Sequence, residues 1–160
     1  MKKFQEILEH ALMCFVAIIA GIMVSKYCIF VLTVEGSSME PAYEEGDIRF
    51  ALVQGNPVRG DVVVVDNVKP NEHLIKRVIG MPGDTIQVVD SKVYLNGSVL
   101  VEDYIPYDEY PSGIAEDEIH LGINEYFVMG DNRPVSYDSR YFGCISRSDI
   151  RGIVIGGRVE

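Results

Sequence analysis

The sequence predicts an all-β domain, with coiled antiparallel sheets in a barrel-like arrangement, attached to one N-terminal transmembrane helix. Three observations support this fold class. A long apolar run lies near the N-terminus, short β-branched runs separated by turn residues follow it, and no long helical period occurs after the first run.

The composition limits the possible functions. The chain has 160 residues, of which 48% are hydrophobic and 24% charged, so it is not a disordered or low-complexity chain. Its net charge of −10 argues against nucleic-acid binding, which needs basic residues to neutralise phosphates. Three Cys are too few for a disulfide scaffold.

The first predicted element is the apolar run over residues 11–32, interrupted only by Ser25 and Lys26. As a helix it would span roughly 33 Å, enough for a bilayer core. A cleaved signal peptide is the main alternative, because Lys2 and Lys3 precede the run. The run is too long for a typical signal peptide, and no small-x-small cleavage site follows it. We therefore expect residues 1–34 to be a retained membrane anchor.

The distribution of Lys residues gives an orientation. Lys2 and Lys3 precede the span, and Lys26 lies near its far end. The positive-inside rule favours a cytoplasmic N-terminus. Residues 35–160 would then be an extracytoplasmic β-rich domain on the cell membrane.

Short β-type runs fill most of the second part. They cover residues 61–65, 74–79, 85–89, 92–95, 98–101, 126–129 and 153–155. Asn96-Gly97 joins two of them and predicts a two-residue hairpin turn, because both residue types tolerate positive φ. The acidic stretch 102–125 has little periodicity and is expected to be a solvated surface excursion. Contact of Ile105, Tyr107 and Tyr110 with a partner is the alternative.

Lys76 is a candidate for chemistry because it lies inside an apolar strand, on one face with Leu74 and Val78. Burial disfavours the charged amine and lowers the pKa of a Lys, so a neutral Lys76 could act as a general base. The alternative is an edge-strand Lys that protects against aggregation. The residues alone leave both interpretations open.

Ser38 is a second candidate, although turns rich in Gly and Ser are common. A Ser hydroxyl attacks a carbonyl only when a base removes its proton. His73 and His120 are candidates for that base, but both lie in polar surroundings and are expected at the surface. The Gly-x-Ser-x-Gly elbow is absent, because Met39 follows Ser38 directly.

A third polar cluster spans residues 130–140. In an extended chain, Ser136, Asp138 and Arg140 would share one face, and Asp138 would pair with Arg140. A simple turn stiffened by an ion pair is the alternative.

Taken together, these clusters resemble the bacterial type I signal peptidases, membrane-anchored Ser–Lys proteases, and in particular their short Gram-positive form. The resemblance covers nearly the whole chain. It rests on the N-terminal span followed by Gly36-Ser37-Ser38-Met39-Glu40-Pro41, Gly60-Asp61, Lys76-Arg77-Val78-Ile79-Gly80-Met81-Pro82-Gly83-Asp84, and Gly130-Asp131-Asn132-Arg133 with Ser136, Asp138, Ser139, Arg140 and Gly143.

The resemblance implies a role for each matching residue. Ser38 would be the nucleophile, and Lys76 the general base and later the acid, with its amine oriented by Ser136. Asp138 and Arg140 would form a supporting ion pair, with Arg77 nearby. The oxyanion and substrate pocket would include the Ser38 backbone N–H together with Gly36, Ser37 and Met39.

The resemblance also implies the substrate, namely signal peptides of secretory preproteins cleaved after small residues at the bilayer surface. The substrate would bind as an added β-strand. No cofactor and no metal is expected, and the oligomeric state is not indicated. A mitochondrial or conjugation-system relative is one alternative function, and a silent β module that binds extended peptides is another.

Overall fold

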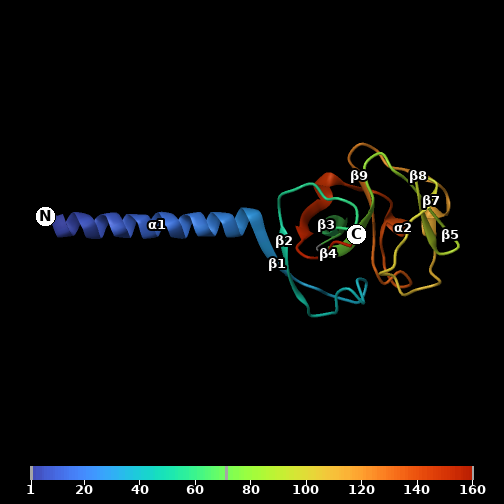
Figure 1. The fold of residues 1–160 in the computed structure, drawn as a ribbon, viewed down its shortest axis with the longest axis horizontal. Coiled ribbons are helices and arrows are strands. Elements are labelled where there is room, and N and C mark those ends of the chain that lie inside the picture. The colour runs from blue at the N-terminus through green and yellow to red at the C-terminus, as the bar shows by residue number, and fades with distance from the viewer. Residues whose placement is uncertain (1, 71, 160) are drawn as a thin grey trace.

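A computed structural model describes residues 2–70 and 72–159, without the side chains of residues 2, 4, 8, 24–27 and 69. One long helix projects from a β domain (Figure 1). This helix, α1 (Lys2–Cys28), contains a segment, Gln5–Met23, that is long and apolar enough to cross a membrane, with a mean hydropathy of 1.9. The predicted orientation depends on Lys2, Lys3 and Lys26. The side chains of Lys2 and Lys26 are not among those that the structure describes.

The apolar run does not continue as a helix to Leu32, so that expectation is wrong for its last residues. Helix α1 ends at Cys28, and strand β1 (Ile29–Thr33) begins at the next residue. β1 pairs with β2 (Ile48–Leu52) along its whole length. Leu32 packs against the core cluster that contains Val34 and Met39, so these residues gain more from joining the sheet than from extending the helix.

The larger sheet has seven antiparallel strands in the order β1-β2-β11-β3-β4-β9-β10. Besides β1 and β2 it contains β3 (Val62–Lys69), β4 (Glu72–Gly80), β9 (Glu125–Met129), β10 (Ile145–Ser146) and β11 (Ile150–Val154). The smaller sheet, in the order β7-β6-β5-β8, contains β5 (Thr85–Val89), β6 (Lys92–Leu95), β7 (Ser98–Val99) and β8 (Ile119–His120).

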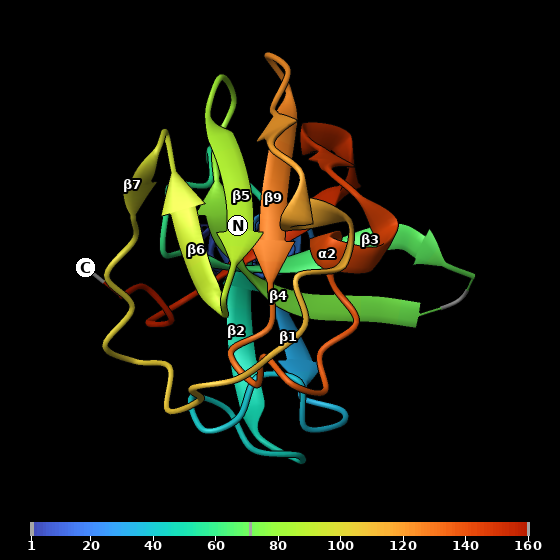
Figure 2. The same cartoon turned by 90° about the vertical axis from the view of Figure 1, so that its right-hand side faces the viewer.

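The all-β prediction with one apolar helix is confirmed, but the described strands form no closed barrel. Each sheet is open, and β1 and β10 are the edges of the larger one. Figure 2 shows the smaller sheet beside β4 and β9. Helical turns are short: η1 (Gly113–Glu116), α2 (Ser139–Phe142) and η2 (Arg147–Asp149).

The predicted hairpin is present between β6 and β7. Asn96 and Gly97 have φ values of 52° and 79°, as a two-residue turn of this kind requires. The second strand ends at Val99 rather than at residue 101.

Two buried clusters matter for the position of the site. Ile86, Val88 and Val93 of the smaller sheet pack against Phe127 and Met129 of β9 in the larger sheet. A second cluster is formed by Val34, Met39, Tyr43, Ala51, Val62, Val64 and Val154, with Ile75 of β4 packed against it. This second cluster holds the segment after β1 against the sheet.

Candidate active site

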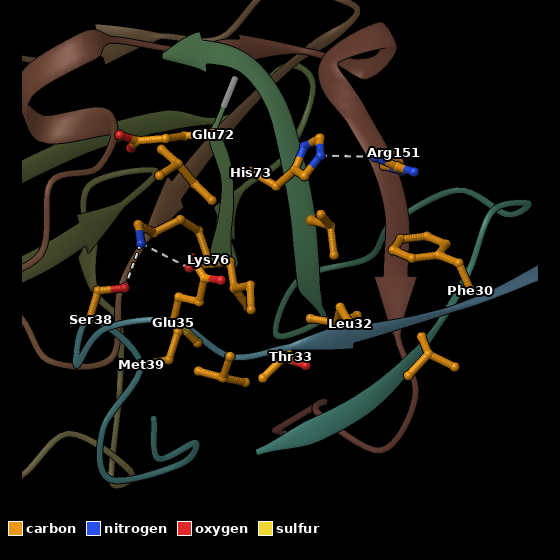
Figure 3. A pocket seen from close by; sticks show the side chains of 15 residues that line it. Phe30, Leu32, Thr33, Glu35, Ser38, Met39, Glu72, His73, Lys76 and Arg151 are labelled. Carbon is orange, nitrogen blue, oxygen red and sulfur yellow. Dashed lines mark hydrogen bonds between the residues drawn. The ribbon is translucent and has the colours of Figure 1, made fainter. Parts of the chain in front are cut away.

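Ser38 and Lys76, which are 38 positions apart in the sequence, meet in the folded chain. Lys76 Nζ donates a hydrogen bond to Ser38 Oγ at 2.7 Å and another to the Ile75 carbonyl oxygen at 2.9 Å (Figure 3). Lys76 is only 2% exposed, as its place in an apolar strand predicts. A buried amine in contact with a half-buried hydroxyl is the arrangement that activates a Ser nucleophile.

The loop after β9 holds Ser38 in place. The Asn132 backbone N–H donates to the Ser38 carbonyl oxygen at 3.0 Å, and Asn132 Nδ2 donates to the Ser37 carbonyl oxygen at 3.1 Å. Gly130 makes the close approach possible, because a Cβ there would overlap the Ser38 carbonyl oxygen and Ser136 Oγ. The Ser38 position therefore depends on two segments that are far apart in the sequence.

The residues flanking Ser38 differ in burial. Met39 is 1% exposed and belongs to the core cluster beneath the turn, whereas Gly36 and Ser37 are exposed. Gly36 has a φ of 73°, in the left-handed region that favours glycine. The Ser38 backbone N–H donates to no group among the described residues, so it is available to an incoming oxygen.

Ser136 does not make the hydrogen bond that the resemblance implies. Its hydroxyl is buried and has no hydrogen-bond partner among the described residues. The Lys76 amine donates to Ser38 Oγ and to the Ile75 carbonyl oxygen. Ser136 lies against Gly130, whose missing side chain leaves room for both Ser136 Oγ and the Ser38 carbonyl.

The structure contains the Asp138–Arg140 ion pair that the sequence predicts. Arg140 Nε and Nη2 donate to the two carboxylate oxygens at 2.8 Å, and both side chains are fully buried. Asp138 Oδ2 also accepts from the Gly130 backbone N–H at 3.0 Å. The segment is not extended as expected, because Asp138 caps α2, which begins at Ser139.

Arg77 belongs to a different ion pair from the one expected. Arg77 follows Lys76 in β4, so its side chain lies on the opposite face of the strand. Its Nε and Nη2 donate to Asp131 at 2.8 Å and 2.5 Å. Arg77 Nη1 also donates to the Gly60 carbonyl oxygen at 2.8 Å. Burial lowers the pKa of Arg77, but pairing with Asp131 more than compensates and raises it.

The acidic excursion is not a solvated loop where it passes the site, so that expectation is wrong for its first part. Glu102 accepts from Arg133 Nη1 at 2.9 Å and from Nη2 at 2.5 Å, and both side chains are almost fully buried. The Tyr104 ring lies 4.8 Å from the Arg77 guanidinium. The Tyr110 ring lies 5.4 Å from the guanidinium groups of both Arg133 and Arg140.

Sequence reasoning missed Glu102, Tyr104 and Tyr110 as partners of the buried arginines. A turn closes from Glu102 to Ile105, so the segment has no strand-like alternation that could have indicated these contacts. Residues 102–110 form a strap over the loop that holds Ser38, and we call this segment the strap.

A groove of about 560 Å³ runs away from the Ser38–Lys76 contact. One wall is β1 with the residues that follow it, and the other is the first half of β4. β9 pairs with β4 only from Arg77 onward, and β1 is the edge of its sheet. Both walls therefore present backbone edges that no described strand occupies.

The two candidate histidines lie elsewhere, and both are exposed as expected. His73 lies away from Ser38 in the groove, on the side of Arg151 (Figure 3). It is hydrogen-bonded to Asp66. His120 contacts Thr85 in the smaller sheet. Neither has a recorded hydrogen bond to Ser38.

Comparisons with known proteins identify the family to which this chain belongs. The family model described as "Signal peptidase, peptidase S26" matches residues 7–156. Signal peptidase I P of Bacillus subtilis subsp. natto is 31% identical over 94% of this chain and 88% of its own length. Signal peptidase IB of Staphylococcus aureus (strain COL) is 33% identical over 96% of this chain and 89% of its own length.

A solved structure is also similar. The crystal structure of a signal peptidase I from Enterococcus faecalis V583 matches with a TM-score of 0.54 and 30% identity. The match covers 62% of this chain and 97% of that chain.

Proposed function

We propose that this chain, which belongs to the signal peptidase family (peptidase S26), removes signal peptides from exported preproteins with Ser38 as nucleophile and Lys76 as general base. The observation that carries the proposal is the 2.7 Å contact between Lys76 Nζ and Ser38 Oγ. The burial of Lys76 matters as much as this distance, because removal of water from an amine favours its uncharged form, which can accept a proton.

The reaction follows from this contact. Lys76 takes the Ser38 proton as the hydroxyl oxygen attacks the scissile carbonyl, and the Ser38 N–H stabilises the oxyanion. The protonated Lys76 then protonates the leaving amine, which frees the mature protein and leaves an acyl-enzyme on Ser38. Lys76 next takes a proton from water, which attacks the ester, and gives that proton to Ser38 Oγ as the signal peptide leaves.

The substrate would enter the groove as an extended strand. Both walls present unpaired backbone edges, and an added strand can hydrogen-bond to such edges whatever its side chains are. Met39 fills the space beneath Ser38. With Met39 as its floor, the groove next to Ser38 would be shallow. Larger substrate side chains would clash with this floor, which would explain cleavage after small residues.

Buried ion pairs support the geometry. Asp138, held by Arg140, fixes the Gly130 backbone, and Gly130 makes room for the Ser38 carbonyl. We assign Asp138, Arg140 and Ser136 to support of the site. Arg77, which is bound to Asp131, supports the same loop from the other face of β4.

The apolar helix supports a reaction at a membrane surface. β1 begins directly after α1, and its residues line the groove. A preprotein held in the same bilayer by its own apolar segment would present its cleavage site at that level. The proposed location is the cell membrane, with the N-terminus cytoplasmic and residues 35–160 on the extracytoplasmic face.

The test is cleavage of a reporter preprotein by the full chain, with the cut site identified by mass spectrometry. We expect Ser38→Ala and Lys76→Ala each to abolish cleavage while the circular dichroism spectrum stays unchanged. Lys92→Ala, at an exposed Lys of β6, is the matched control and should retain activity. Full activity of either site variant, or peptide binding without cleavage by the unmodified chain, would overturn the proposal.

A further inference from the structure

The end of the groove far from Ser38 carries a positioned cation, Arg151 (Figure 3). We propose that Arg151 binds the free carbonyl oxygens at the C-terminal end of the substrate's membrane helix. The inference rests on the proposed function, since it concerns how the same groove receives a membrane-bound preprotein.

Arg151 is directed into the groove by a β-bulge. The register between β11 and β3 shifts between Ile150 and Gly152, so Arg151 is the extra residue on its strand. A bulge of this kind re-aims a side chain and often occurs beside an active site.

Neighbouring side chains then fix the guanidinium group. Its Cζ lies 5.0 Å from the centre of the Phe30 ring, and Nη1 lies 3.1 Å from His73 Nε2. His73 Nδ1 is 2.7 Å from Asp66 Oδ1, so a proton on Nδ1 bonds to Asp66 and leaves Nε2 to accept from Arg151. The ring fits because residue 152 is Gly, since a Cβ there would lie 2.7 Å from a Phe30 carbon.

Arg151 keeps donors for a ligand. Among the described residues, its side chain contacts His73 through Nη1 and the Phe30 ring, so Nε and Nη2 remain available. A cation that is held on one side and open on the other, within a substrate groove, can bind electronegative oxygens.

The position of Arg151 identifies those oxygens. Phe30 is the second residue after α1, so this end of the groove lies where the chain leaves its own membrane helix. The β1 wall from Phe30 to Glu35 corresponds to about 17 Å of extended chain, or about five substrate residues before the cut. Farther upstream, an apolar substrate segment in the bilayer must be helical to satisfy its backbone groups.

The last carbonyl groups of such a helix have no partner within the helix. They also carry the negative end of the helix dipole, which a cation stabilises. Arg151 would therefore hold the junction between helical and extended substrate, regardless of sequence. This role requires only backbone oxygens, so it fits preproteins of differing sequence.

The experiment compares Arg151→Gln with the unmodified full chain in liposomes, on two substrates. One is a preprotein with its complete apolar segment, and the other is a short peptide that covers only the residues around the cut. For the preprotein we expect a rise in KM of about threefold to tenfold with kcat unchanged. For the short peptide, KM should not change.

Substrate and enzyme controls sharpen the test. Inserting three residues between the apolar segment and the cleavage site moves the helix end away from Arg151, so the effect of Arg151→Gln should disappear. Arg49→Gln removes a cation of β2 that pairs with Asp47 outside the groove, and it should behave like the unmodified chain.

Three results would overturn the inference. They are equal losses on both substrates, persistence of the effect after the insertion, and an effect that occurs only with anionic lipids, which would indicate headgroup binding. Absence of cleavage by the unmodified chain, or cleavage by Ser38→Ala, would instead count against the proposed function. The two failures can therefore be told apart.

Discussion

Lys76 joins two properties that seldom occur together, namely a side chain that forms a cation and a place among the buried residues of a sheet. Its stem lies within β4, and its amine reaches Ser38 Oγ and the Ile75 carbonyl. Both of these acceptors are neutral oxygens. Water would stabilise the charged amine at this position, and burial removes that water.

The proposed role of Lys76 gives activity a definite pH dependence. The base must be uncharged, so kcat/KM should fall as the pH decreases, by about tenfold per pH unit on the acid side. Initial rates on the short peptide, measured with enzyme first shown to remain folded at each pH, test this expectation. A profile that stays flat down to pH 5 would contradict a Lys base.

Gly130 has no side chain, and this leaves room for the Ser38 carbonyl oxygen and the Ser136 hydroxyl. We expect Gly130→Ala to lower kcat by about a hundredfold, because the methyl group must displace the Ser38 carbonyl or the Ser136 hydroxyl. Cleavage kinetics with matched thermal melts would measure the effect. Gly122→Ala is the control, since its Cβ would meet only the flexible side chain of Glu125, and equal losses in the two variants would contradict this account.

At the scale of elements, the strap stabilises the loop that follows β9. Glu102→Gln would leave the buried Arg133 without a full counter-charge, so we expect a loss of about 3 kcal/mol or more in the free energy of unfolding. Chemical denaturation of the full chain in detergent would measure the loss. Glu109→Gln, at an exposed position of the same strap, should change stability by less than about 0.5 kcal/mol.

The turn between β4 and β5 makes stability depend on pH. Burial raises the pKa of Asp84, but hydrogen bonds from Asn96, the Met81 backbone and Arg59 outweigh it, so the pKa is lowered overall. A carboxylate with a lowered pKa in the folded chain stabilises the fold above its unfolded pKa of about 3.9. This contribution is lost as the pH falls through the folded value.

Asp84→Asn should therefore lower the Tm at pH 7, and its difference from the unmodified chain should shrink below about pH 4. Thermal melts across this pH range test the prediction. Asp90→Asn, at an exposed turn position, serves as the control. A constant difference between Asp84→Asn and the unmodified chain at all pH values would show that the lost stability does not come from the carboxylate charge.

At the scale of the whole molecule, the local patterns predicted the hairpin and seven of the described strands, but not β1, β2, β8 or β10. The ordered motifs predicted that Ser38 would meet Lys76, but the implied contact of Ser136 with Lys76 is absent. The strands that span 85–89 and 92–95 are as expected, because their β-branched residues and turn signals agree. The partners of Arg77 and Arg133 were not predictable, since ion pairing between distant segments depends on the fold rather than on spacing. Strand β1 was missed because a short apolar strand directly after an apolar helix continues the same composition.

The junction between α1 and β1 predicts where the chain can be shortened without loss of the β domain. A chain that starts at Ile29 keeps β1 and should fold and cleave the short peptide, although it should not stay in liposomes. A chain that starts at Glu35 loses β1 and Val34, which exposes the buried cluster around Met39 and removes one wall of the groove. We expect that shorter chain to melt at a lower temperature and to lose peptide cleavage. Circular dichroism melts and peptide kinetics on the two chains provide the measurement, and equal activity would show that β1 is dispensable for the groove.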